Sequence, residues 1–117
     1  MKATTNTKLL MAKLQVYKLI NLNFNQMERT QLIRELQSKY PKMFLSTTEE
    51  FNGEEGGIWT SGEDAPVNAK GLPIFDYYTE KYDWYELGIE SKFMEYLDKL
   101  GWYCEWHDCG TIMIYPN

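Results

Sequence analysis

The sequence contains few of the residues that most often carry catalysis, metal binding or covalent cross-links. It has two cysteines and one histidine in 117 residues. Two cysteines are too few for a disulfide-stabilised scaffold. All three residues fall between Cys104 and Cys109. Any zinc site or cysteine nucleophile with a histidine base would therefore have to be built from this one stretch.

Long apolar runs are also missing. No segment reaches the roughly 18 uncharged apolar residues that a membrane-spanning helix needs. Near the N-terminus, only the four residues LLMA are apolar in a row, between Lys8 and Lys13, which is too short for the core of a signal peptide. We therefore expect a cytoplasmic protein without a membrane segment.

Basic residues are scarce in the second part of the chain. Residues 49–117 hold four lysines against fifteen Asp or Glu, whereas residues 1–48 hold eight Lys or Arg against two Glu. The two parts have net charges of −11 and +6, and the whole chain has −5. Either the basic part lies against the acidic remainder of its own fold, or it forms a surface for a partner.

The apolar content is sufficient for a folded core, since 44% of the residues are hydrophobic and 15% are aromatic. We expect one domain over residues 1–117, with the polar residues 1–7 frayed. Residues 14–23 leave two possibilities open, because their alternation favours a strand while the preceding residues also suit a helix.

Two amphipathic helices are predicted. The apolar positions at helical spacing are Leu32, Ile33, Leu36 and Tyr40 in the first, and Ile89, Phe93, Leu97 and Leu100 in the second. Asn25 and Glu28 form a capping-box pattern at the start of the first helix, and Pro41 ends it. Gly101 suits the position that follows the end of the second helix.

Each helix is followed by a predicted hairpin. In the first hairpin, over residues 43–62, Asn52-Gly53 suits a tight type I′ turn, although the stretch EEGG could form the turn instead. The register of the Asn52-Gly53 turn pairs Thr47 with Ile58 and Leu45 with Thr60, and it places Phe44 and Trp59 on the opposite face.

In the second hairpin we expect the loop Asp108-Cys109-Gly110, with Gly110 in the left-handed conformation. The paired residues are then His107 with Thr111, Trp106 with Ile112, Cys104 with Ile114, and Tyr103 with Tyr115. Cys104 points into the core, whereas His107 points to solvent and Cys109 lies exposed in the turn. This arrangement disfavours both a zinc site and a Cys–His nucleophile.

Together these elements predict an α+β fold. Two α-β-β units are joined by a long, aromatic-rich loop over residues 62–88, and they form an antiparallel sheet of about four strands with two main helices on one face.

The densest candidate site is the aromatic and acidic segment 75–86. Eleven of the eighteen aromatic residues lie between positions 72 and 106. The candidate partner-binding residues are Asp76, Tyr77, Tyr78, Glu80, Tyr82, Asp83, Trp84, Tyr85 and Glu86. Aromatic side chains are enriched in binding hot spots, and the carboxylates would repel nucleic acid but attract a protein with a basic surface. Alternatively, these rings cover the second face of the sheet.

Carboxylates offer a second candidate site. If the turns that hold them met at one end of the sheet, Glu54, Glu55, Glu63 and Asp64 would form an acidic rim that could hold a divalent metal ion. Such adjacent carboxylates are more often a solvated edge that blocks strand pairing.

The stretches LGIESKFMEYLDKLGWYCEWHDCGTIMIYP, GGIWTSGED and PIFDYY resemble small uncharacterised proteins of tailed bacteriophages, over residues 56–116. The resemblance implies a non-enzymatic role in the host cytosol or the virion, and it assigns no functional residue. The leading prediction is a small acidic interaction protein, without a cofactor, that binds a host or viral protein. A metal-dependent hydrolase and a self-assembling structural component remain as alternatives.

Overall fold

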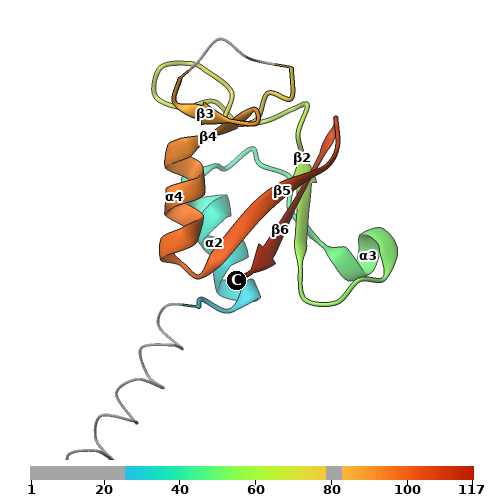
Figure 1. Ribbon diagram of the computed structural model, residues 1–117. Coiled ribbons are helices and arrows are strands. Elements are labelled where there is room, and N and C mark those ends of the chain that lie inside the picture. The colour runs from blue at the N-terminus through green and yellow to red at the C-terminus, as the bar shows by residue number, and fades with distance from the viewer. Residues whose placement is uncertain (1–25, 79–82) are drawn as a thin grey trace, which may run out of the picture.

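The computed structural model describes residues 26–78 and 83–117. Within these ranges four strands form an antiparallel sheet in the order β1-β2-β6-β5 (Figure 1). The strands are β1 (Ser46–Thr47), β2 (Ile58–Ser61), β5 (Trp102–Asp108) and β6 (Thr111–Pro116). Two short strands, β3 (Tyr85–Glu86) and β4 (Ile89–Glu90), form a second sheet. The predicted α+β class is confirmed, whereas the expectations for residues 1–7 and 14–23 lie outside the described residues.

Two helices, α2 (Arg29–Lys39) and α4 (Ser91–Lys99), pack on one face of the four-stranded sheet (Figure 1). Their buried side chains meet those of the sheet in one core. The fully buried members include Leu32, Leu36, Ile58, Phe93, Leu97, Ile112 and Ile114. No helix in the part of the chain that the structure describes is both long and apolar enough to cross a membrane.

The start of α2 differs from the capping-box prediction. The helix begins at Arg29, and Glu28 occupies the N-cap position without a side-chain hydrogen bond. The cause is a pair of long-range bonds at Met27. Its N–H donates to the carbonyl of Leu100 at 2.8 Å, and its carbonyl accepts from Nε1 of Trp102 at 2.6 Å. These bonds hold Met27 outside the helix.

The end of α4 agrees with the sequence. Gly101 follows the helix with a φ of 81°, as predicted for a residue in the left-handed conformation. Ile89 differs from the prediction, because it belongs to β4 and not to the helix.

The first hairpin has the predicted register but a different turn. Thr47 pairs with Ile58, as expected. The connection is the short helix α3 (Thr48–Asn52), which ends at Gly53 with a φ of 83°. The prediction of a type I′ turn is wrong, because Thr47 caps this helix. The side-chain oxygen of Thr47 accepts from the N–H of Glu50 at 3.4 Å.

The second hairpin also has the predicted pairs, with a correction at its tip. Tyr103 with Tyr115, Cys104 with Ile114, and Trp106 with Ile112 are all paired. The register then shifts, so that Asp108 rather than His107 pairs with Thr111. Gly110 is not in the left-handed conformation. The Asp108 carboxylate accepts from the N–H of Gly110 at 2.9 Å, which favours the shorter turn and leaves His107 in a bulge.

The second face of the sheet is partly covered by α3. The Phe51 ring lies 4.9 Å from that of Trp59 and 5.3 Å from that of His107. Phe44 adds a ring 4.8 Å from Trp59, on the face predicted for both. Phe75 lies on the other side, against Phe93 of α4. The alternative that the rings of segment 75–86 cover the second face is therefore wrong for Phe75.

Replacement of Phe93 tests the core. Its ring is 1% exposed and lies between those of Tyr40, at 5.9 Å, and Phe75, at 5.2 Å. Phe93→Ala should lower the free energy of unfolding by about 3–5 kcal/mol, as large aromatic truncations in cores do. Phe44→Ala, at a position that is 51% exposed, should cost only about 1 kcal/mol. Urea denaturation of both variants measures the difference, and equal losses would contradict this core.

Candidate functional site

The long segment between β2 and α4 includes β3 and β4. Its residues 74–76 are anchored by backbone hydrogen bonds to β4 and to the turn that precedes β4. The N–H of Asp76 donates to the carbonyl of Gly88 at 2.7 Å, and the N–H of Glu90 donates to the carbonyl of Ile74 at 2.9 Å. Ile74 and Phe75 are thereby buried in the core.

The turn between β3 and β4 is attached to the tip of the β5–β6 hairpin. Nε1 of Trp106 donates to the carbonyl of Leu87 at 2.6 Å. Leu87 has a φ of 49°, and Gly88 follows with a φ of 77°. A Cβ atom at Gly88 would lie 2.3 Å from the carbonyl oxygen of Asp76. The close approach of these two backbone segments therefore requires glycine at this position.

Three large side chains are exposed in the segments that meet near the hairpin tip. Tyr77 is 48% exposed, Tyr78 78% and Leu87 89%. The Tyr77 ring packs 5.1 Å from that of Trp106 and 5.2 Å from that of Tyr78. We call Tyr77, Tyr78 and Leu87 the tip patch. A hydrogen bond with the Cys109 thiol raises the pKa of Tyr78 above its ordinary value, which places Tyr78 against the hairpin turn.

The surroundings of the tip patch are acidic. The described stretches that adjoin it, 61–64, 76–78, 83–88 and 106–111, contain neither lysine nor arginine. They contain five exposed carboxylates and one half-buried one: Glu63, Asp64, Asp83, Glu86, Asp108 and, half-buried, Asp76. A cationic surface would be attracted here, and a polyanion would be repelled.

The structure divides the predicted partner-binding segment. Tyr77 and Tyr78 belong to the tip patch, whereas Trp84 lines a cavity beside Lys70, whose ammonium lies 5.3 Å from the indole. The Tyr85 hydroxyl donates to the carbonyl of Pro73. Of the remaining candidates, Glu80 and Tyr82 lie outside the described residues.

The sequence pattern does not indicate Leu87. A single apolar residue in a loop has no periodic pattern around it. The only local signal is the glycine that follows it, which is compatible with a tight turn.

The proposed acidic rim is not assembled. The Glu54 carboxylate accepts from the Tyr115 hydroxyl at 3.1 Å, near one end of β6, while Glu63 lies beside Gly110 at the other end. Glu49, a nearby carboxylate in α3, already has a partner. Arg29 donates to it at 2.6 Å and holds the pKa of Glu49 at about 2. Among residues 26–78 and 83–117, no group of three or more His, Cys, Asp or Glu could hold a metal ion.

The cysteines lie as the hairpin register predicts. Cys104 is 7% exposed, whereas Cys109 is exposed at the turn. Burial, with a smaller contribution from Glu105, raises the pKa of Cys104 to about 12. The exposed His107 ring contacts Phe51 rather than either thiol.

Comparison with known proteins adds no assignment: no family model, curated protein or solved structure matches the chain. The resemblance to phage proteins therefore stays a prediction.

Thiol labelling separates the two cysteines. In native protein at pH 8, iodoacetamide should modify Cys109 quickly and Cys104 only after unfolding, because Cys104 is buried and remains a neutral thiol well below its pKa of about 12. Peptide mass spectrometry measures both rates. Fast labelling of Cys104 in the folded protein would show that the face carrying Trp102 and Trp106 is open.

Two glycine replacements test the anchoring of the tip patch. Gly71 and Gly88 have nearly the same φ, 78° and 77°, but a Cβ atom at Gly71 meets nothing within 4 Å. Gly71→Ala should cost about 1–2 kcal/mol from backbone strain alone. Gly88→Ala should cost clearly more and should increase the solvent exposure of Trp106. Thermal denaturation and tryptophan fluorescence give both quantities, and equal stability losses would contradict the close contact at Asp76.

Proposed function

We propose that this protein is a small, non-enzymatic interaction protein that binds a protein partner with a basic surface through the tip patch. The observation that carries the proposal is the combination of three exposed side chains, Tyr77, Tyr78 and Leu87, with neighbouring described stretches that carry carboxylates and contain neither lysine nor arginine. An exposed apolar patch with a polar border is typical of protein–protein contact sites.

The support beneath the tip patch favours binding energetically. The Trp106–Leu87 hydrogen bond and the Asp76–Gly88 hydrogen bond fix the backbone on which the patch side chains stand. A surface that is already ordered loses less conformational entropy when it binds. Tyrosine adds a large contact area with few rotatable bonds.

The carboxylates determine the kind of partner. Opposite charge raises the rate of association and is screened by salt, whereas the apolar centre of a contact mainly slows dissociation. A host or viral protein with exposed lysine or arginine around an apolar depression would complement this surface. The resemblance to phage proteins supports a partner of that origin.

The apolar centre is tested with Tyr78→Ser and Leu87→Asn. Asparagine is chosen at Leu87 because it tolerates a positive φ. The wild-type chain is used to capture a partner from a lysate of the source cells, and binding kinetics are then measured with the purified partner. The double variant should dissociate at least about tenfold faster, corresponding to the loss of ~1.4 kcal/mol or more.

The matched control is Tyr103→Ser, which removes a 42% exposed tyrosine from the second face of the sheet. It should leave the kinetics unchanged. If the control weakens binding and the double variant does not, the contact lies on the second face and the tip patch is not the site.

The charge is tested with Glu63→Gln, Asp64→Asn and Glu86→Gln together. This variant should associate more slowly with the same partner and should show a weaker dependence on salt, because steering is reduced. The control is Glu35→Gln, Glu55→Gln and Glu95→Gln, which changes the net charge equally at exposed sites elsewhere. Equal effects of the two sets would contradict a carboxylate border that acts locally.

A further inference from the structure

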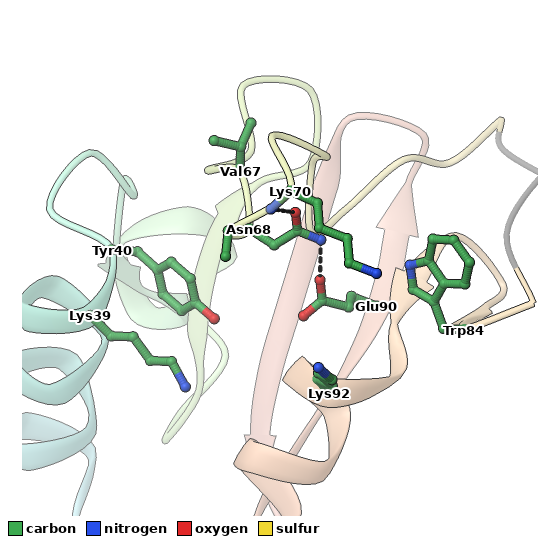
Figure 2. Close-up of a pocket in the computed structure, with 9 residues that line it drawn as sticks. Lys39, Tyr40, Val67, Asn68, Lys70, Trp84, Glu90 and Lys92 are labelled. Atoms are coloured by element: carbon green, nitrogen blue, oxygen red, sulfur yellow. Dashed lines mark hydrogen bonds between the residues drawn. The ribbon is translucent and has the colours of Figure 1, made fainter.

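A cavity of about 580 Å³ lies on another part of the surface, between the end of α2, the loop 67–70 and the start of α4 (Figure 2). Its volume falls in the range of small-molecule sites, roughly 300–1,000 Å³. The polar side chains that line it are Lys39, Tyr40, Asn68, Lys70, Glu90 and Lys92. Trp84 adds an aromatic wall on one side.

The floor of the cavity is a buried carboxylate. Glu90 is 6% exposed. Its Oε2 accepts from Nδ2 of Asn68 at 2.7 Å, and its other oxygen, Oε1, has no hydrogen-bond donor among the described residues. Figure 2 shows the carboxylate pointing into the cavity, with the Tyr40 hydroxyl facing it. Oε1 is not among the buried atoms without a partner, so it is open to the cavity, where a ligand that supplies an N–H group can form a charge-assisted hydrogen bond with it.

Asn68 holds this carboxylate in a fixed orientation. Its Oδ1 accepts from the N–H of Lys70 at 2.9 Å and from the N–H of Leu72 at 3.1 Å. With its oxygen engaged in this way, the Asn68 amide must direct its NH₂ group toward Glu90. The floor is therefore built before any ligand arrives.

The border of the cavity is positively charged. Lys39 lies over the Tyr96 ring at 3.8 Å and Lys70 lies over the Trp84 ring at 5.3 Å, while Lys92 is exposed. Within the described ranges, none of these three lysines forms a salt bridge with a carboxylate. Their ammonium groups are available to an anionic group at the entrance.

We infer that this cavity binds a small zwitterion, whose protonated amine contacts Glu90 and the Tyr40 hydroxyl and whose carboxylate or phosphate contacts the lysines. A ligand with only negative charge would meet Glu90, and one with only positive charge would meet the three lysines. A molecule that carries both charges a few ångströms apart satisfies both parts of the site. Burial, followed by the charge of Glu90, raises the pKa of Tyr40 to about 12, so its hydroxyl is neutral at pH 7 and can accept a hydrogen bond from the amine.

The test is an NMR titration of the ¹⁵N-labelled full chain with each of the twenty common L-amino acids and with phosphoethanolamine. At least one probe should shift both the side-chain amide of Asn68 and the backbone amide of Glu90. The amino acids and phosphoethanolamine distinguish a carboxylate from a phosphate as the anionic group. If no probe shifts these signals at 10 mM, the proposal is wrong.

Blocked analogues of the binding probe test each charge separately. Acetylation of its amine, and amidation or esterification of its acid, should each weaken binding at least tenfold. If the acetylated analogue binds as well as the probe itself, Glu90 does not contact the amine and the proposal fails.

Two variants test the residues. Glu90→Gln and Lys92→Met should each weaken binding of the probe at least tenfold, whereas the controls Glu95→Gln and Lys99→Met, on the exposed part of α4, should not. If Glu90→Gln fails to fold, Lys92→Met alone tests the site, because the Lys92 side chain is exposed and its replacement should not disturb folding. Tip-patch variants should leave probe binding unchanged, so this inference and the proposed function can fail independently.

Discussion

Strands β2 and β6 lie side by side at the centre of the sheet and join the two α-β-β halves. Ile58 pairs with Ile114, Trp59 with Met113, and Thr60 with Ile112. Each strand is the second of its own hairpin, so their pairing produces the order β1-β2-β6-β5 and brings α2 and α4 to the same face (Figure 1). Without this pairing, neither half has enough covered surface for a stable core.

Both candidate sites depend on that central pair. Next to it, the N–H of Gly62 donates to the carbonyl of Gly110 at 2.9 Å, which sets the hairpin tip beside the long loop. Trp106 then reaches the carbonyl of Leu87 and supports the tip patch. The same loop returns through β4 to α4, and this path places Glu90 at the floor of the cavity. The two sites are thus separate surfaces that one loop positions.

Much of the fold could be predicted from local patterns. The alternation of apolar residues predicted the pairs of the second hairpin, and the apolar stripes at helical spacing predicted α2 and α4. Both patterns arise because one face of each element is buried. The failures have non-local or side-chain causes. Met27 is held out of α2 by residues more than seventy positions away, Thr47 caps a helix in place of a turn, and the Asp108 carboxylate shortens the second hairpin.

The sites were only partly predictable. The aromatic and acidic composition indicated a segment that contains two residues of the tip patch, Tyr77 and Tyr78. It could not separate Tyr78 from Trp84, because hydrogen bonds distant in sequence determine the path of the loop. Glu90 had no distinguishing pattern, since an acidic residue before a helix is ordinary. Its role depends on Asn68, twenty-two positions away, which no local spacing could reveal.

Native-state hydrogen exchange tests the central pairing most directly. The backbone amides of β2 and β6 that bond across the pair should be among the slowest in the chain, and they should exchange only through global unfolding, with the same denaturant dependence as the amides of α4. Exchange of the β2 amides through a smaller opening, while β5, β6 and α4 stay protected, would show that the C-terminal half is stable alone. That result would contradict the dependence of the fold on this pair.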